Sequence, residues 1–324
     1  MHAEQRPFWS VMIPAHKPNH YVLEAIQSVL VQAPEPQRMQ IEVLIDGPVG
    51  DDALDQIRRV CGSRVGIYLH GTTVGQSGNL NTAIQRATGE WIHLLHHDDL
   101  VLPGFYSALE AGIRAAPHVG AAFVRHAFID EHGHWQRLSH LERRTAGIPD
   151  DWLRQLAVYC RFQTPSIAVK RSVYRSIGGF REDLVFALDW EMWVRIARQF
   201  DYWFEPRILA LYRVTEAGVS GSMRRSAADM HDVMKAVEIM AGYLPPQIRD
   251  DCRRAALESH AIGALEMARA MYLRNDPEGG ANQMKAALSM SKSPKIFALG
   301  ARIQLGRLRR MLFGARAMAG AAGS

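Results

Sequence analysis

The feature that most constrains the fold is an apolar run that ends in two adjacent carboxylates. Residues 91–95 are Trp-Ile-His-Leu-Leu, and Asp98 and Asp99 follow after two histidines. A short run of this composition, preceded by Thr88-Gly89-Glu90, predicts a buried central strand. In an open α/β sheet, ligands bind outside the carboxyl ends of the strands, which is where this acid pair would lie.

The acid pair allows two interpretations. Adjacent carboxylates repel one another unless a cation neutralises them. Hard cations such as Mg²⁺ or Mn²⁺ prefer oxygen ligands and commonly join them to a substrate's phosphates. The alternative is a solvated Asp-Asp turn that caps a helix near Pro103. Short motifs arise by chance, so the pair alone favours neither.

Strand-like and helix-like segments alternate before this run. The strands are expected at residues 10–13, 41–45 and 65–69, and the helices at 21–31, 51–60 and 77–87. Strict alternation predicts parallel strands joined by right-handed crossovers. Polar groups follow three of the strand ends, and the third helix opens with glycines whose backbone amides suit an anion. This half therefore predicts a nucleotide-binding surface.

The second half of the chain changes character. Strands are expected at 120–128, 165–169 and 202–214, a polar turn at 130–133, and a helix at 188–200. From residue 222 onward the pattern predicts only helices. Their expected ranges are 226–243, 246–273, 277–291 and 294–318.

Composition excludes several classes of protein. With 324 residues and 48% hydrophobic content, the chain can bury a full core. The three cysteines are far apart, which excludes a disulfide framework or zinc motif and fits a reducing cytoplasm. No apolar run approaches membrane-spanning length, and residues 1–7 lack the apolar segment of a signal peptide, so we expect a cytoplasmic protein.

The net charge of +5 comes from the C-terminal tail. Eight lysines and arginines and no acid follow Glu278, which leaves the rest of the chain net acidic. A nucleic-acid binder would spread basic and aromatic residues over its folded domain, so we expect no nucleic-acid partner.

An ordered set of motifs resembles the inverting glycosyltransferases of family 2, which have the GT-A fold. The resemblance covers about residues 8–221. The motifs are Ser10-Val11-Met12-Ile13-Pro14, Asp46-Gly47, Gly75 with Asn81, Gly89-Glu90, Asp98-Asp99, Gly178-Gly179-Phe180, Asp189-Trp190-Glu191-Met192-Trp193-Val194-Arg195 and Leu211-Tyr212-Arg213. No single motif decides the resemblance; their order does.

The resemblance implies a fold and a reaction. The fold is α/β, with a Rossmann-like, mixed and mainly parallel central sheet in a GT-A domain over residues 1–221. Its donor-binding half would span about 8–100 and its acceptor half about 101–221, before a helical C-terminal region at 222–324. The reaction is transfer of a sugar from a nucleotide-diphosphate donor to a glycan or lipid-linked glycan, in surface polysaccharide, lipopolysaccharide or glycolipid synthesis.

The resemblance also implies roles for individual residues. Asp99 would bind Mn²⁺ or Mg²⁺ on the donor's diphosphate, Asp98 would face the ribose or join the metal ligands, and Asp189 would be the general base. A carboxylate in hydrogen-bond reach of the acceptor hydroxyl is what such a reaction needs. The other donor-binding residues would be Pro14, His16, Asp46, Gly75, Asn81, Asp98 and Arg213, with Asp46 facing the nucleobase and Arg213 a phosphate oxygen.

Each role has a structural alternative. Asp189 is also suited to a helix N-cap, Asp46 to a turn before Gly47-Pro48, and Arg213 to a surface charge. Trp190 and Trp193 are expected in the helix core or cleft wall. His93, between apolar neighbours, is expected to be a hydrogen-bonded core residue.

The sequence departs from the family pattern at two places. His96 stands where many relatives carry the first Asp of an Asp-x-Asp-Asp run, and the second strand ends in Asp46-Gly47-Pro48 instead of Asp-Asp-Gly-Ser. The lost acid could weaken metal binding, bring His96 or His97 into the ligand set, or change the donor preference.

The basic tail predicts an amphipathic helix. One face would carry Ile296, Leu299, Ile303, Leu308, Met311 and Leu312, with the arginines largely off it. Such a helix suits an anionic membrane surface, as for a peripheral enzyme on the inner face of the plasma membrane. It equally suits packing on the protein or on another subunit.

Two other functions compete with sugar transfer. A non-catalytic module that binds nucleotide sugars or glycans is suggested by His96, although Asp99 and Asp189 are retained. A nucleotidyltransferase would need a glycine-rich, basic phosphate loop after the first strand. Residues 14–19, Pro-Ala-His-Lys-Pro-Asn, do not form such a loop.

Overall fold

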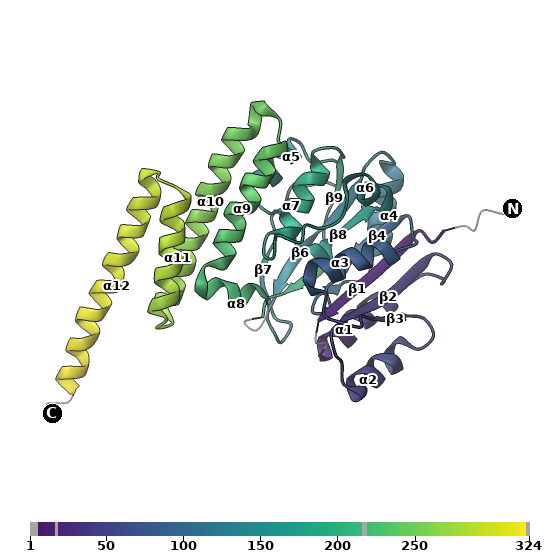
Figure 1. The fold of residues 1–324 in the computed structure, drawn as a ribbon, viewed down its shortest axis with the longest axis horizontal. Helices are drawn as coiled ribbons and strands as arrows, with labels where there is room; N and C mark the ends of the chain where they lie inside the picture. Colours follow the sequence, from purple (N-terminus) through teal and green to yellow (C-terminus); the bar gives the residue numbers. More distant parts are fainter. Residues whose placement is uncertain (1–5, 17–18, 216–218, 322–324) are drawn as a thin grey trace. The chain divides into compact units, whose positions relative to one another are not determined.

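The chain divides into two compact units. The computed structural model describes residues 6–16, 19–215 and 219–321 (Figure 1). Unit 1 comprises Met1–Leu156 and Cys160–Thr215, and unit 2 comprises Ala157–Tyr159 and Glu216–Ser324. The sequence predicted the boundary at 221/222, and the structure divides the chain at 215/216.

Four parallel strands form the first half of the sheet in unit 1, in the order β3-β2-β1-β4. This half confirms the predicted alternation of strand and helix. Its elements are β1 (Trp9–His16), α1 (His20–Leu30), β2 (Met39–Asp46), α2 (Asp51–Cys61), β3 (Gly66–Leu69), α3 (Gly75–Arg86) and β4 (Trp91–Leu94). His16 and Asp46 lie side by side at the ends of β1 and β2, so the predicted polar groups meet at one edge.

The second half of the sheet is mixed. The order continues β4-β8-β6-β9-β5, with β7 paired to β6. Strand β8 is antiparallel to both neighbours, β6 and β9 are parallel, and β5 and β7 are antiparallel to their partners. The strands are β5 (Leu100–Val101), β6 (Ala121–Ile129), β7 (Trp135–Leu138), β8 (Ile167–Lys170) and β9 (Tyr202–Arg213). The sequence missed β5 and β7.

Short helices connect these strands. They are α4 (Phe105–Ala115), α5 (Trp152–Val158), the 3₁₀ turn η1 (Thr164–Ser166), α6 (Arg171–Ile177) and α7 (Leu188–Ala197). The predicted strand at 165–169 was wrong at its start, because Pro165 fixes a helical φ and lies in η1. The sheet and its helices bury an apolar core that includes Trp9, Trp91 and Phe105.

Unit 2 is entirely helical within its described residues, as predicted. Its helices are α8 (Val219–Ser226), α9 (Ala228–Tyr243), α10 (Pro246–Leu273), α11 (Pro277–Met290) and α12 (Pro294–Ala321). Proline begins three of them, where its missing N–H removes no helical hydrogen bond. The predicted break between α10 and α11 is confirmed: Asn275 has a left-handed φ of 62°, and the Asp276 side chain accepts from the N–H of Gly279.

Two composition-based expectations can be compared with the structure. Cys61, Cys160 and Cys252 are not joined by disulfide bonds. Among the described residues, none of the helices combines the length and the apolar character that crossing a bilayer requires.

Candidate active site

Asp46 holds the start of helix α3. Its carboxylate is buried and accepts from the N–H of Val74 at 2.7 Å and from the N–H of Gly75 at 3.0 Å. Gly75 adopts a φ of +76°, a conformation that favours glycine. Asp46 and Gly75, both predicted donor-binding residues, are therefore in direct contact.

The other predicted residues of this edge, Pro14 and His16, contact His97 and Asp46 respectively. Nδ1 of His16 lies 3.0 Å from the carbonyl oxygen of Asp46 and 3.6 Å from its Oδ2. The carbonyl oxygen of Pro14 accepts from the N–H of His97 at 3.3 Å. The structure thus brings Pro14, His16, Asp46 and Gly75 together, and His97 connects them to the acid pair.

Asp99 is fully buried and only half satisfied. Its Oδ1 accepts from the backbone N–H of Arg213 at 2.8 Å, whereas its Oδ2 has no hydrogen-bond partner. Burial raises the pKa of Asp99 well above its ordinary value, and the charge of Asp98 raises it further. A buried carboxylate oxygen without a partner is costly, so a bound cation would stabilise this arrangement.

His96, Asp98 and Asp99 form a candidate cation-binding set. Each offers one ligand atom, and these atoms all lie within 4.8 Å of one another. Burial lowers the pKa of His96, which favours the neutral imidazole that ligates metals. Two carboxylates and one imidazole suit Mn²⁺, and the unpartnered Asp99 oxygen fits this use. The residues present therefore fit a divalent cation.

Arg213 lies within a polar network instead of on the surface. Its side chain is only 2% exposed, and its guanidinium carbon lies 4.2 Å from the centre of the Tyr21 ring. All three guanidinium nitrogens donate within the protein: Nε to Asp98 O (2.9 Å), Nη1 to Asp130 O (3.3 Å) and Glu131 O (3.2 Å), and Nη2 to Glu24 Oε2 (2.7 Å). This geometry corrects the alternative of a surface charge, because the Arg213 side chain is buried. The expected contact with a phosphate oxygen stays a prediction.

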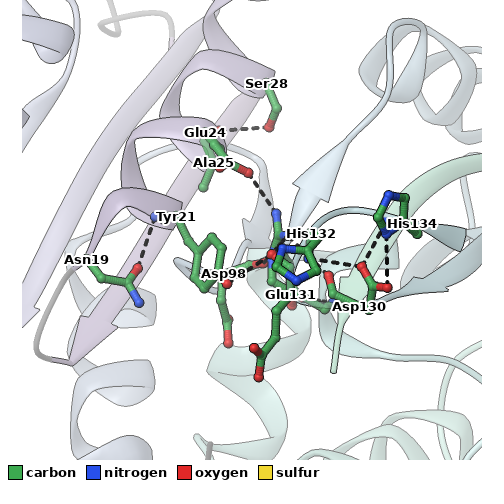
Figure 2. A network of polar contacts seen from close by, with 12 residues as sticks. Asn19, Tyr21, Glu24, Ala25, Ser28, Asp98, Asp130, Glu131, His132 and His134 are labelled. Atoms are coloured by element: carbon green, nitrogen blue, oxygen red, sulfur yellow. Dashed lines mark hydrogen bonds and ion pairs between the residues drawn. The ribbon is translucent and has the colours of Figure 1, made fainter. Parts of the chain in front are cut away.

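The sequence missed the partners of Arg213. Figure 2 shows Tyr21 and Glu24 of α1 beside Asp98 and the turn from Asp130 to His134. The Tyr21 hydroxyl donates to the carbonyl oxygen of Glu131 at 3.0 Å. Tyr21 and Glu24 are spaced i, i+3 and so share one face of α1. No sequence motif indicated Tyr21 and Glu24, because Arg213, which contacts both, is far away in sequence.

Asp189 lies in the first turn of α7. Its Oδ1 accepts from the N–H of Trp190 at 2.7 Å, and its Oδ2 accepts from the Thr164 hydroxyl at 3.3 Å. The N-cap position belongs to Ala187, so Asp189 is not the N-cap. Burial raises the pKa of Asp189 to about 6 despite these hydrogen bonds, so it titrates close to neutral pH. Among the described residues, no hydrogen bond or ion pair joins it to Asp98 or Asp99.

Asn81 binds the protein backbone. Its Oδ1 accepts from the N–H of Phe180 at 2.7 Å, and its Nδ2 donates to the carbonyl oxygen of Phe180 at 3.0 Å. A Cβ on Gly179 would lie 2.2 Å from Oδ1 of Asn81. This contact explains why Asn81 and the Gly-Gly-Phe motif occur together. It gives Asn81 a structural role, and its expected contact with the donor stays a prediction.

The three expected core residues are confirmed. His93 is fully buried, with Nδ1 3.1 Å from the Tyr106 hydroxyl and Nε2 3.0 Å from the carbonyl oxygen of Pro165. Burial lowers its pKa to about 4. Trp190 and Trp193 are 2% and 0% exposed, which places both in the core.

Several curated proteins resemble this chain in sequence. An uncharacterised glycosyltransferase of Rickettsia typhi is 26% identical over 222 residues, 65% of this chain and 65% of the relative. An uncharacterised protein of Sinorhizobium fredii is 27% identical over 258 residues, 74% of this chain. The chain spans slightly less than two thirds of the first relative's length and 27% of the second's.

Solved structures share the fold. S. aureus TarS 1–349 in complex with UDP-GlcNAc superposes with a TM-score of 0.66 at 14% identity, covering 95% of this chain and 91% of that one. Mannosyltransferase PcManGT from Pyrobaculum calidifontis, in complex with GDP-Man and Mn²⁺, gives a TM-score of 0.58 at 19% identity. It covers 94% of this chain and 81% of that one.

The predicted fold class is thereby confirmed. In addition, the family model for glycosyl transferase family 2 matches residues 10–178, which is about half of the chain. The match includes β1, β2, β4 and the acid pair. From this match we conclude that the chain belongs to glycosyltransferase family 2 and has its GT-A fold.

Proposed function

We propose that this protein transfers a sugar, with inversion, from a nucleoside diphosphate donor to an acceptor hydroxyl. One observation carries the proposal: His96, Asp98 and Asp99 converge near the carboxyl ends of parallel strands, and the buried Oδ2 of Asp99 lacks a partner. This edge is where α/β sheets bind their ligands. The two neighbours solved with nucleotide-sugar donors, described above, support a donor of that class.

The three cluster residues would hold a divalent cation, Mn²⁺ or Mg²⁺. When bound, such an ion offsets the negative charge that builds up on the departing diphosphate. Asp98 and Asp99 supply the oxygen ligands, and His96 takes the place of the acid that many relatives carry. The ion in the mannosyltransferase neighbour's structure is Mn²⁺, in keeping with this choice.

Asp189 is proposed as the general base. An acceptor hydroxyl is a weak nucleophile, and a carboxylate that takes its proton accelerates the attack. A base with a pKa of about 6 is ionised at neutral pH and still accepts a proton readily. The Thr164 hydroxyl and the Trp190 N–H orient the carboxylate. A single base on the face opposite the leaving group gives direct displacement and inversion.

Pro14, His16, Asp46 and Gly75 would line the donor side of the site. Asp46 fixes the first turn of α3, so its proposed contribution to the nucleobase pocket is to shape the loop that carries Gly75. The half-exposed His16 ring is free to contact the donor directly. The proposed acceptor is a glycan or lipid-linked glycan used in cell-surface assembly.

Thermal stability with nucleotides tests this proposal. We expect one of UDP, GDP, CDP or dTDP to raise the melting temperature in the presence of Mn²⁺, because a ligand of the folded state stabilises it by mass action. Asp99→Asn should remove the Mn²⁺-dependent shift. The same change at the exposed Asp55, on α2, serves as the matched control and should leave the shift intact.

Turnover separates an enzyme from a binding module. We expect release of nucleoside diphosphate from the matching donor, and its loss in Asp189→Asn with donor binding retained. Binding without any turnover in the native chain would favour the non-catalytic module. No shift with any nucleotide would overturn the proposed donor site.

A further inference from the structure

Up to Arg310, where the description of its side chains ends, helix α12 has one covered and one exposed apolar face. Ile296 and Ile303 are 0% and 7% exposed. Between them, Gly300 faces Met284 of α11 and Leu265 of α10. Of the two alternatives for the predicted apolar face, packing on the protein is therefore confirmed for its isoleucines, which pack against the rest of unit 2, whereas Leu308 of that face is exposed. Two other predicted members, Met311 and Leu312, lie outside the residues whose side chains the structure describes.

A second apolar stripe is exposed along α12. Phe297, Leu305 and Leu308 are 48%, 58% and 53% exposed, and Ala301 between them is also exposed. Their spacing of i, i+4, i+8 and i+11 places them along one side of the helix. Four neighbouring apolar side chains, three of them large, are more than the single exposed residues normal on a protein surface.

Basic residues lie on both sides of this exposed stripe. At 100° per residue, Arg302 and Arg309 lie on one flank, and both are exposed. On the other flank, a groove of about 440 Å³ lies between α11 and α12. Its lining includes Lys285, Lys292 and Gln304. No acid follows Glu278 in the sequence, so no acidic side chain of α12 offsets these charges.

The charge pattern discriminates between the possible partners of the stripe. A second copy of this chain would bring the same basic residues to the contact and so oppose it by like-charge repulsion. An anionic lipid surface attracts basic residues and accepts apolar side chains between its headgroups. Apolar residues flanked by arginine and lysine are the combination found in helices that lie in the membrane interface.

We propose that the stripe of Phe297, Ala301, Leu305 and Leu308, flanked by Arg302 and Arg309, binds an anionic lipid surface. The helix lies in the plane of the interface and does not cross the bilayer. This inference is independent of the proposed sugar transfer, because vesicle binding can be measured without donor or acceptor.

Vesicle sedimentation tests the proposal with the full chain. We expect binding to phosphatidylcholine vesicles that contain about 30% phosphatidylglycerol, and not to phosphatidylcholine alone. Binding should weaken at about 0.5 M salt, since screening reduces the attraction. Leu305→Glu should lower the apparent affinity by about tenfold or more, because it removes apolar area and adds a repelled charge.

Matched variants separate the stripe from general effects. Val31→Glu changes an apolar residue that directly follows α1 and is 74% exposed, and it should leave binding unchanged. Arg302→Glu with Arg309→Glu should abolish binding, whereas Arg58→Glu with Arg59→Glu, which changes net charge equally, should not. Circular dichroism and the melting temperature establish that each variant is folded.

Three results would overturn the proposal. The first is equal binding to neutral vesicles, or no binding to anionic ones. The second is unchanged binding by a folded Leu305→Glu variant. The third is an oligomer in solution that Leu305→Glu converts to a monomer, which would assign the stripe to self-association.

Discussion

The backbone N–H of Arg213 donates to Oδ1 of Asp99 at 2.8 Å, while its Nε donates to the carbonyl oxygen of Asp98 at 2.9 Å. One residue at the end of β9 therefore holds both members of the acid pair. The remaining guanidinium nitrogens hold Glu24 and the turn at Asp130 and Glu131. Arg213 is thus a positioning residue for the candidate cation set.

Arg213→Met should weaken Mn²⁺ binding by about tenfold or more, because the loop with Asp98 loses a charged hydrogen bond and Glu24 loses its partner. The backbone contact to Asp99 remains. Calorimetric titration of Mn²⁺ measures the effect. Arg207→Met, which breaks the ion pair between the exposed Arg207 and the buried Glu205 on the same strand, is the control and should bind Mn²⁺ normally. An equal loss of Mn²⁺ affinity in both variants would show that Arg213 contributes only to the general stability of the fold.

The turnover rate should decrease as the pH is lowered, with an apparent pKa of about 6. Burial raises the pKa of Asp189 to about 6, and only its carboxylate form can take the acceptor's proton. The rate of nucleoside diphosphate release, measured as kcat/KM against pH, gives the value. An acid limb near the ordinary value of 3.8 would contradict the assignment of Asp189 as the base.

Asp189→Asn should stabilise the fold at neutral pH and above. A raised pKa means that the unfolded chain ionises first, so the folded state loses stability as pH rises from about 3.8 through about 6. Asparagine does not ionise and escapes this loss. The variant's gain in melting temperature over the native chain should therefore be larger at about pH 8 than at about pH 4. A gain of the same size at both values would show that ionisation is not its cause.

His96→Asp should preserve Mn²⁺ binding and strengthen Mg²⁺ binding, because an oxygen ligand suits the harder ion better than an imidazole does. His96→Ala should weaken binding of both ions, since it removes one of the three ligand atoms. Calorimetry with each ion provides the comparison. His96→Ala with native affinity for both ions would exclude His96 from the ligand set.

Asn81 and Gly179 should be energetically coupled. Asn81→Ala removes two hydrogen bonds to the Phe180 backbone and should destabilise the fold by about 1–3 kcal/mol. Gly179→Ala places a Cβ against Oδ1 of Asn81 and should also destabilise. Because the clash needs the Asn81 side chain, the second change should cost less in the Asn81→Ala background. Urea unfolding of the four proteins measures the coupling, and strictly additive losses would contradict it.

The hydrophobic pattern and the helix boundary residues were sufficient to predict the strands and helices that carry such signals in their own sequence. The first four strands alternate with amphipathic helices, and α10 begins and ends at the predicted residues because Pro246 opens it and the Asn275-Asp276-Pro277 break follows it. Strands β5 and β7 have only two and four residues, too few for a clear pattern. Strand β5 forms by pairing with the distant β9, and β7 by pairing with the preceding β6. The antiparallel insertion of β8 between β4 and β6 is similarly a long-range choice.

In the candidate site too, the sequence predicts the local features and not the contacts between residues far apart in the chain. The acid pair and the polar groups after β1 and β2 could be predicted, because parallel strands end at one edge of a sheet. The partners of Arg213 could not, since Glu24 lies 189 residues away in sequence. Residue type also did not predict the contacts of Arg213 and Asn81. Both side chains are suited to a ligand, and in the structure both donate to backbone carbonyl oxygens of the protein.

The most direct test is donor turnover by the native chain and by Asp189→Asn, with Mn²⁺ present and with Mn²⁺ removed by a chelator. We predict Mn²⁺-dependent release of nucleoside diphosphate from one donor class, and a rate about 10²-fold or more lower in Asp189→Asn, whose donor-induced melting shift persists. Native-rate turnover by a folded Asp189→Asn, or turnover unaffected by the chelator, would contradict the proposed mechanism.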